Sequence, residues 1–284
     1  YASAFFARQG KEESNLTEFQ TLKIVHDCIK HCLRGDVFQI VPSRRFAQKF
    51  EGDDFQVYRA LRSVNPSPYL FYFDYDEYRI FGASPEKQIK IEGDVAEIHP
   101  IAGTFRRSGD DARDAELAQE LLADPKETAE HVMLVDLARN DLSRSADHVK
   151  VETFKEVQFF SHVIHLVSKV TGKLQKGVNP LQLVADTFPA GTLSGAPKHN
   201  AMTIINRLEP TNRAIYGGAI GFMDFDGNFN HAIAIRTFLS KGDTLFYQAG
   251  MGVVAKSSAE SEMQEIHNKL AALRKALEVA ENLA

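Results

Sequence analysis

Cysteine is scarce in this chain of 284 residues, which contains only Cys28 and Cys32. The two lie four residues apart in an apolar helical pattern, so we interpret them as buried, reduced thiols. So small a number excludes a disulfide framework and a cysteine-rich zinc site. No apolar run approaches the ~18 residues that a membrane-spanning helix needs, and no signal-peptide pattern opens the chain. We therefore expect a cytoplasmic protein with no membrane partner.

Basic residues are not in excess, which bears on the possible partners. Lysine and arginine number 33 against 38 aspartates and glutamates, which gives a formal net charge of −5. No dense basic tract offsets this charge, so a general nucleic-acid binder is disfavoured. The hydrophobic share of 44% and the charged share of 25% are ordinary for a globular protein, and the length supports a sizeable core.

The hydrophobic periodicity predicts groups of hairpins separated by helices. Helical spacing covers 16–33, 53–63, 111–123, 126–142, 181–188, 197–208 and 258–282, and strand-like patterns cover 36–42, 69–81, 89–98, 149–170, 218–223, 231–239 and 244–248. Because the strands come mostly as hairpins, we predict an α+β fold rich in antiparallel strands. No linker or short repeat divides the chain, so a single compact domain is the simplest expectation.

Two pairs of glutamates, Glu127 with Glu130 and Glu262 with Glu265, are each spaced three residues apart on a predicted helix. Residues at this spacing share one helical face, so each pair directs two carboxylates to nearly the same place. A hard divalent cation, Mg²⁺ before Ca²⁺ or Mn²⁺, would make that arrangement favourable. The alternative is a chance E-x-x-E on a solvated helix, and either pair alone leaves this alternative open.

Two further features could bind a small anion, and a third could be catalytic. Residues 191–198 form a small-residue loop before a helix, where free N–H groups favour an anion, although turn chemistry alone could explain the loop. Alternation places Arg236 on one strand face with Ala232 and Ala234, where it has room to grip a carboxylate; an exposed edge-strand arginine is the alternative. His165 lies on a strand face that we predict to point inward, where a hydrogen-bonded core histidine is the alternative to a catalytic one.

Longer motifs carry a resemblance to a known family, the chorismate-utilising enzymes. They are Pro-Ile-Ala-Gly-Thr at 100–104, the glutamate helix at 127–141, Gly-Thr-Leu-Ser-Gly-Ala-Pro-Lys at 191–198, Tyr-Gly-Gly-Ala-Ile-Gly at 216–221 and Gln-Ala-Gly-Met-Gly-Val-Val at 248–254. Within this family, the chain most resembles component I of anthranilate synthase. The resemblance implies one catalytic domain over 16–284, an α+β fold of two packed, largely antiparallel β-sheets flanked by outer helices. Residues 1–15 would be the remnant of an upstream region, so we expect the chain to be a fragment.

The resemblance also implies a role for each part of the site. The metal is Mg²⁺, which holds the ring carboxylate of chorismate, and its ligands are Glu127, Glu130, Glu262 and Glu265. The substrate-binding positions are Tyr216, Arg236 and Gly252 at the enolpyruvyl carboxylate, together with Gly103 and Thr104. The catalytic positions are His165 as an acid/base group, Glu86 as the general acid for the departing C4 hydroxyl, and Thr192, which contacts the substrate.

Ala102 selects the branch of the family. Aminodeoxychorismate, isochorismate and salicylate synthases typically carry lysine at this position, as a nucleophile or as the base for water. Without that amine, ammonia must itself attack C2, and pyruvate elimination then gives anthranilate. Enzymes that stop at 2-amino-2-deoxyisochorismate, an aminodeoxychorismate synthase component I, and a relative that binds chorismate without turnover stay open as alternatives.

The ammonia implies a partner. The resemblance implies that a glutamine amidotransferase subunit supplies it, since the sequence contains no glutaminase motif such as a nucleophile-elbow cysteine.

Overall fold

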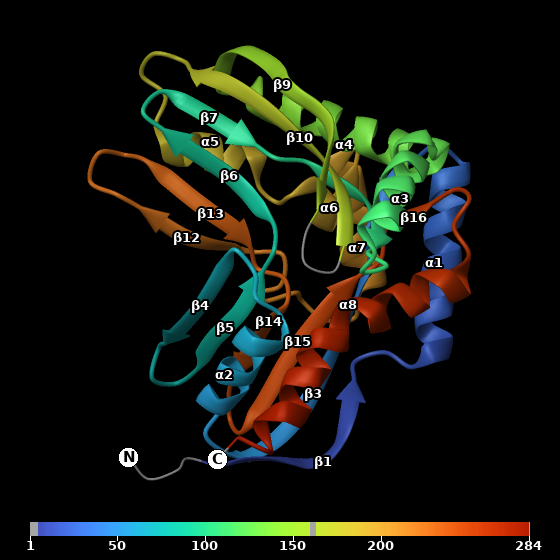
Figure 1. Ribbon diagram of the computed structural model, residues 1–284, viewed down its shortest axis with the longest axis vertical. Helices are drawn as coiled ribbons and strands as arrows, with labels where there is room; N and C mark the ends of the chain where they lie inside the picture. Colours follow the sequence, from blue (N-terminus) through green and yellow to red (C-terminus); the bar gives the residue numbers. More distant parts are fainter. Residues whose placement is uncertain (1–4, 160–162, 284) are drawn as a thin grey trace. The chain divides into compact units, whose positions relative to one another are not determined.

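The computed structural model describes residues 5–159 and 163–283, with the side chain of Thr104 outside that description. Contacts between residues divide the chain into two compact units, each assembled from segments that are distant in sequence (Figure 1). Unit 1 comprises Tyr1–Glu86, Thr192–Ala219 and Ile233–Ala284, and unit 2 comprises Lys87–Gly191 and Ile220–Ala232. The expectation of a single domain over 16–284 stays a prediction.

Unit 1 is built on a six-stranded sheet in which the described strand pairs are antiparallel. The strand order is β1 (Phe6–Ser14), β3 (Ser43–Gly52), β15 (Thr244–Gly250), β14 (Thr237–Ser240), β5 (Arg79–Ser84) and β4 (Tyr69–Asp74). A second, three-stranded sheet has the order β11 (Gly195–Ala196), β2 (Gln39–Ile40) and β16 (Val253–Val254). Chain segments from both ends of the sequence therefore meet in this unit.

The helices of unit 1 are α1 (Glu18–Leu33), α2 (Phe55–Val64), α7 (Lys198–Leu208) and α8 (Ala259–Ala280). Helix α1 begins with a reciprocal capping box, in which Thr17 accepts from the Gln20 backbone and the Gln20 side chain accepts from the Thr17 backbone. Helix α8 contacts α2, α1 and β15, and Ile266 and Leu270 on its apolar face are fully buried. This packing fixes the helix that carries Glu262 and Glu265.

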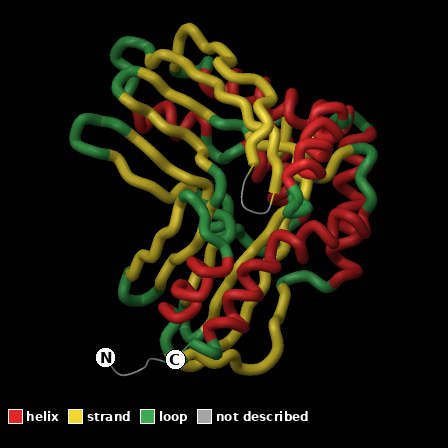
Figure 2. Tube along the Cα trace, in the orientation of Figure 1, coloured by secondary structure: helices red, strands yellow, loops and turns green. Residues whose placement is uncertain are grey.

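Unit 2 is built on a seven-stranded sheet, whose strands are yellow in Figure 2. Its order is β12 (Ala219–Met223), β13 (Phe229–Ile233), β6 (Lys87–Glu92), β7 (Val95–Ile98), β10 (Val163–Leu174) and β8 (Ile101–Arg106), with β9 (Ala146–Phe159) also paired to β10. Its helices are α3 (Asp111–Ala123), α4 (Pro125–Leu142) and α5 (Pro180–Thr187), and the short α6 (Gly191–Ser194) lies at the boundary of the units. The prediction of an α+β fold with largely antiparallel sheets is confirmed.

Three predicted strands need correction. The strand expected at 36–42 is reduced to β2, and the long β3 that follows was not predicted because its buried face mixes Arg44 and Gln48 with two phenylalanines. The strand expected at 149–170 is two paired strands, β9 and β10. The strand expected at 231–239 is interrupted between β13 and β14, where Arg236 has a φ of 50°.

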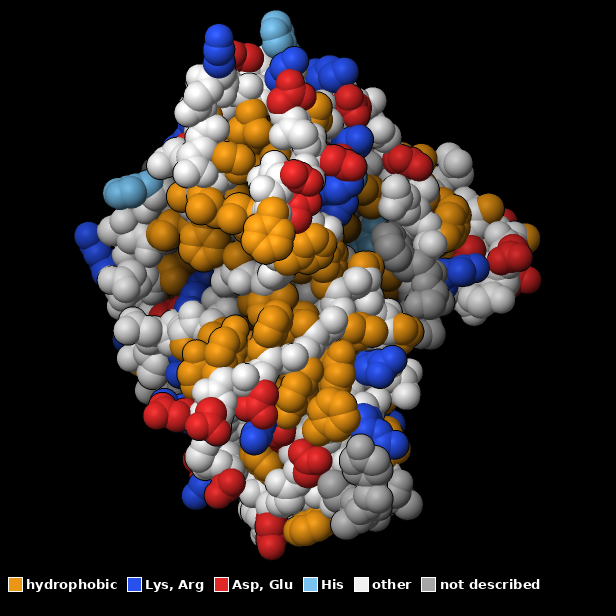
Figure 3. Space-filling model, turned by 90° about the vertical axis from the view of Figure 1, so that its left-hand side faces the viewer, with side chains coloured by type: hydrophobic (Ala, Val, Ile, Leu, Met, Phe, Trp, Pro, Cys, Tyr) orange, Lys and Arg blue, Asp and Glu red, His pale blue; other side chains and the backbone are white. Residues whose placement is uncertain are grey.

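Hydrophobic side chains are exposed on hairpins of both units. Phe73 and Tyr75 are exposed in unit 1 at the end of β4, and Phe222 and Phe225 are exposed in unit 2 beside β12. The face of the molecule drawn in Figure 3 shows hydrophobic side chains in abundance. Among the residues that the structure describes, no helix is both long and apolar enough to cross a membrane.

Candidate functional site

Glu86 follows β5 and is the best candidate for a proton donor in unit 1. The Thr192 hydroxyl donates to the carboxyl oxygen of Glu86 at 3.0 Å, and the backbone carbonyl of Glu86 accepts from Ile233 N–H at 3.0 Å. Burial raises the pKa of Glu86 to about 7, although Thr192 and the positive charges of Lys269 and Arg236 lower it. A carboxyl with this pKa is partly protonated at neutral pH, so it can act as a general acid. The structure thus brings together two of the predicted catalytic residues, Glu86 and Thr192.

Arg236 lies between β13 and β14 in a left-handed backbone conformation with φ 50°. The predicted strand alternation is therefore wrong here, because a left-handed residue interrupts the pleat. Its carbonyl accepts from Ala83 N–H at 3.1 Å, which ties the turn to the edge of β5. Burial lowers the pKa of the guanidinium and Glu86 raises it, yet no hydrogen bond to its side chain occurs among the described residues. A half-buried guanidinium whose donors make no hydrogen bond within the described residues can bind a carboxylate.

Tyr216 is held next to the turn that contains Gly252. Its hydroxyl lies over Gly250, where an added Cβ would come within 2.8 Å of that oxygen, so a side chain there would displace the phenol. Burial raises the pKa of Tyr216, which keeps the phenol protonated and able to donate a hydrogen bond. Met251 N–H donates to Pro42 O at 3.0 Å, which fixes the turn leading to Gly252. Tyr216 and Gly252 are both half-buried, as a ligand-facing position requires.

Glu262 and Glu265 lie in the first two turns of α8, as their spacing predicts. Glu262 is buried and accepts from Ser257 Oγ at 2.7 Å. Glu265 pairs with Lys269 at 2.6 Å, and the same ammonium donates to Gly250 O at 2.8 Å. Lys269 was missed by the sequence reasoning, although its position four residues after Glu265 is the spacing of a helical ion pair.

Glu127 and Glu130 lie at the start of α4 in unit 2. The side chain of Asp124 caps the helix by accepting from the backbone N–H groups of Lys126 and Glu127 at 2.8 and 3.0 Å, and Pro125 occupies the first turn. Glu127 is close to Gly103, since a Cβ added there would lie 3.5 Å from Glu127 Oε2. The structure therefore brings one predicted metal ligand beside one predicted substrate-binding position.

Gly103 forms a left-handed kink in β8, with φ 77°, and the register between β8 and β10 shifts at this point. The carbonyl of Gly103 faces His165 Nδ1 at 3.1 Å. The prediction that His165 points into the core is wrong, because its neighbours Ile164 and Leu166 are the fully buried residues and His165 lies on the opposite, half-buried face. Thr104 pairs with His165 across the two strands, and the side chain of Thr104 lies outside the described part of the chain.

His131 is a buried histidine that the sequence reasoning missed. Its Nε2 lies 2.6 Å from Ser168 Oγ, and Ser168 N–H donates to Pro100 O at 3.0 Å. Burial lowers the pKa of His131 to about 4, so the ring is neutral at physiological pH. The contact supports the strand that carries Ala102, itself buried and without an amine to offer a substrate. The position of His131, next to Glu130 in the predicted helix, was the available signal.

The two glutamate pairs belong to different units, Glu127 with Glu130 to unit 2 and Glu262 with Glu265 to unit 1. Within either unit, the described residues contain no group of three or more histidine, cysteine or carboxylate side chains arranged to hold a metal. Each pair nevertheless offers only carboxylate oxygens from one helix face, a donor set that fits Mg²⁺. The Mg²⁺ site stays a prediction.

Comparisons with known proteins agree on one family. Residues 3–275 match the family model described as chorismate binding enzyme. Anthranilate synthase component 1 of Geobacillus stearothermophilus is 49% identical over 275 residues, which cover 96% of this chain and 54% of that relative. The Aquifex aeolicus protein of the same name is 47% identical over 270 residues, covering 94% of this chain and 55% of the relative. The chain thus spans about half the length of the curated relatives it matches.

Solved structures show the same fold. The crystal structure of anthranilate synthase component I from Streptococcus pneumoniae TIGR4 matches with a TM-score of 0.87 and 40% identity, over 93% of this chain and 59% of that chain. The menaquinone-specific isochorismate synthase of Escherichia coli matches with a TM-score of 0.88 over 98% of this chain and 64% of that chain. At 24% identity, the second likeness shows the fold alone.

Proposed function

The chain belongs to the chorismate-binding enzyme family, and on this premise we propose that it is the catalytic part of an anthranilate synthase component I. In the proposed reaction, ammonia adds at C2 of chorismate and the C4 hydroxyl departs. Loss of pyruvate and a ring proton then gives anthranilate. The observation that carries this choice is Ala102, which leaves no amine where other branches of the family typically have lysine. Relatives of 47–49% identity over most of the chain support it.

Glu86 is proposed to protonate the departing hydroxyl. Its pKa of about 7 lets the carboxyl carry a proton in the ground state and give it up when the C4–O bond breaks, so that the hydroxyl leaves as water. Thr192 orients the acid through its 3.0 Å hydrogen bond to one carboxyl oxygen. Both residues belong to unit 1.

Arg236 and Tyr216 are proposed to hold the enolpyruvyl carboxylate, with a backbone N–H near Gly252. The guanidinium supplies two parallel donors and the phenol a third, which fixes the direction in which the side chain of chorismate leaves. The turn after β15 brings Gly252 near Tyr216 because glycine at position 250 admits the phenol.

His165 is proposed to take the ring proton during elimination. A carbonyl oxygen can only accept, so the 3.1 Å contact with Gly103 O places the proton of the neutral ring on Nδ1. Nε2 is then the basic nitrogen. The kink at Gly103 holds the ring in this orientation.

Glu127, Glu130, Glu262 and Glu265 are proposed to hold Mg²⁺. When bound, the ion would bind the ring carboxylate of chorismate and spread its negative charge. We propose further that ammonia comes from a glutamine amidotransferase subunit, and that the protein is cytoplasmic, as two buried free thiols suggest.

Product analysis tests this proposal. The protein is incubated with chorismate, Mg²⁺ and an ammonium salt at mildly alkaline pH, and products are identified by fluorescence and mass spectrometry. Anthranilate with pyruvate, both abolished by a chelator, is the expected result. Aminodeoxyisochorismate without pyruvate would instead select the enzyme that stops before elimination. Binding of chorismate without any product would contradict an enzymatic role for this chain.

A further inference from the structure

A buried ion pair lies just after α7 in unit 1. Arg213 donates to Glu209 from Nε at 2.9 Å and from Nη2 at 2.6 Å, a bidentate arrangement. The side chain of Glu209 is only 6% exposed and that of Arg213 21%. A pair buried this far is costly unless further hydrogen bonds satisfy it, so its remaining contacts are informative.

Arg213 also donates hydrogen bonds to two backbone carbonyls. Nη1 donates to Leu193 O and Nη2 to Val41 O, both at 2.6 Å. The same two segments also bond to each other, because Val41 N–H donates to Ser194 O at 3.0 Å. The guanidinium therefore clamps the segment that contains Thr192 against the end of β2, and it lies 5.7 Å from the centre of the Tyr216 ring.

Glu209 connects the pair to the strand that leads to Gly252. One oxygen, Oε1, accepts from Ser43 N at 2.8 Å and from Ser43 Oγ at 2.7 Å. Ser43 Oγ in turn accepts from Gln248 Nε2 at 2.7 Å, and Ser43 pairs directly with Gly250 across the sheet. The network thus reaches both sides of the turn on which Tyr216 rests.

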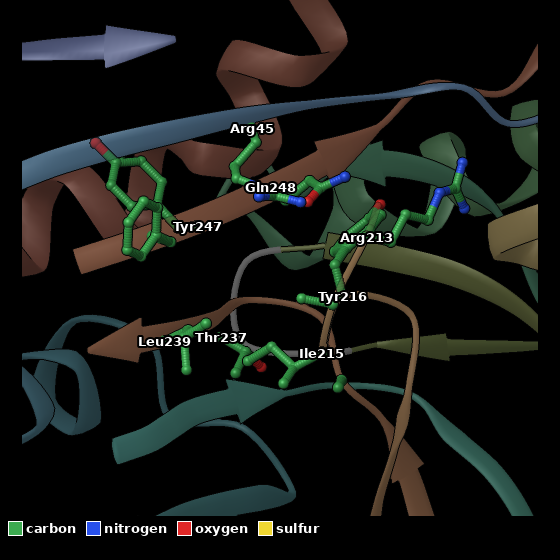
Figure 4. A pocket seen from close by; sticks show the side chains of 11 residues that line it. Arg45, Arg213, Ile215, Tyr216, Thr237, Leu239, Tyr247 and Gln248 are labelled. Carbon is green, nitrogen blue, oxygen red and sulfur yellow. The ribbon is translucent and has the colours of Figure 1, made fainter. Parts of the chain in front are cut away.

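The network borders a partly open pocket of about 110 Å³ in unit 1, and Figure 4 shows Arg213, Tyr216, Gln248 and Arg45 among its lining residues. The space beside Tyr216 is therefore not filled by other side chains. Because side chains do not fill this space, the polar contacts of Arg213 contribute to holding the surrounding segments.

We propose that Glu209 and Arg213 are positioning residues, which hold Thr192, Tyr216 and the turn before Gly252 in the arrangement that binds substrate. This inference rests on the proposed function, which assigns those three positions to the substrate. Neither residue of the pair touches the substrate in this scheme. Their charges offset each other, so the pair contributes geometry to the site without adding net charge.

The test compares Arg213→Lys with Arg274→Lys. Lysine keeps the charge but cannot donate to Glu209 and two carbonyls at once. Arg274 is a matched control in unit 1, since it forms a bidentate pair with Glu12 at 2.8 Å from each nitrogen and lies over the Phe46 ring at 4.9 Å. Glu209→Gln serves as a second variant, because it keeps an acceptor Oε1 for Ser43 while it removes the charge of Glu209 and the contact of Oε2 with Arg213 Nε.

Arg213→Lys is expected to raise KM for chorismate about 10-fold or more, since small misplacements of binding groups are costly. Release of Thr192 also removes a contact that lowers the pKa of Glu86, so the pH profile of kcat/KM should shift to higher pH. Glu209→Gln should move both quantities in the same direction. Arg274→Lys should lower thermal stability and leave KM and the pH profile unchanged.

Amide hydrogen exchange separates failure of this inference from failure of the proposed function, because it needs no turnover. Faster exchange at 192–196 and 216–218 in Arg213→Lys, and not in Arg274→Lys, supports the positioning role even if the wild-type protein makes no anthranilate. Equal loss of thermal stability in the two variants, with unchanged exchange in those segments, unchanged KM and an unshifted pH profile, would overturn it.

Discussion

At the scale of single residues, the environment of Glu86 decides its chemistry. Its carboxyl is withdrawn from water, which penalises the charged form, and the one hydroxyl that contacts it does not fully compensate. A carboxyl group on the surface would be ionised at neutral pH and could not donate a proton. Burial of this one side chain therefore converts an ordinary glutamate into a candidate general acid.

The first prediction concerns Glu86→Gln. In the wild type, the reaction rate divided by the concentration of unprotonated ammonia should fall as pH rises through about 7, because Glu86 loses its proton. The variant should lose that pH dependence. Its kcat should also be about 10²–10⁴-fold lower, which is the usual contribution of a positioned acid. A pH–rate profile checks this, and a variant with the wild-type profile would exclude Glu86 as the acid.

The same carboxyl makes stability depend on pH. Its pKa rises from 4.5 in the unfolded chain to about 7 in the folded one, so the folded state binds the proton more tightly. The stabilisation is fully present below pH 4.5 and is lost as pH rises through 7. As pH rises, the melting temperature should thus fall more steeply in the wild type than in Glu86→Gln. Parallel curves of melting temperature against pH would contradict a raised pKa of Glu86.

Arg236→Lys is the next test at this scale. Lysine keeps the charge and loses the two parallel donors, so KM for chorismate should rise about 10- to 100-fold, as expected for a charged hydrogen bond of about 1.5–3 kcal/mol. Steady-state kinetics measure it. The control Arg113→Lys alters an arginine that is 47% exposed on α3 and should leave KM unchanged. Equal KM values for the two variants would show that Arg236 does not bind the carboxylate.

At the scale of elements, periodicity predicted the helices well and the strand ends less well. Both glutamate pairs lie on helices, as their spacing predicts. Helices follow from local spacing, whereas a strand is fixed by partners that are distant in sequence. The face on which Arg236 lies could not be predicted, because tertiary contacts impose its left-handed backbone.

The packing of α8 gives a prediction at this scale. Leu270 is 1% exposed in the core of unit 1, so Leu270→Ala should reduce the free energy of unfolding by about 2–5 kcal/mol. Leu33→Ala, at a position 69% exposed on α1, should change it by less than about 0.5 kcal/mol. Urea denaturation followed by circular dichroism gives both values, and equal losses would mean that α8 does not pack as described.

At the scale of the whole molecule, the sequence predicted the α+β class and the candidate residues, and it missed the contacts that support them. Lys269 reaches Gly250 O, and His131 reaches Ser168, across long stretches of sequence. No periodicity within one element encodes such contacts. Motifs propose which side chains to consider, and only the folded chain shows how burial raises the pKa of Glu86.

The Mg²⁺ proposal is tested at the same scale, since the glutamates proposed as its ligands belong to both units. Glu127→Gln and Glu265→Gln should each weaken Mg²⁺ binding in isothermal calorimetry. If the four carboxylates share one ion, the double variant should lose less affinity than the sum of the single losses. Glu116→Gln, on the exposed side of α3, is the control. Unchanged Mg²⁺ binding in both single variants would show that these glutamates are not ligands of the metal.

The most direct measurement of the central claim is the fate of ¹⁵N-ammonium in a reaction with chorismate and Mg²⁺. The account predicts anthranilate that carries the label, formed together with an equal amount of pyruvate and absent when a chelator is added. Chorismate that binds to the protein and is recovered unchanged, with neither labelled product nor pyruvate, would contradict it.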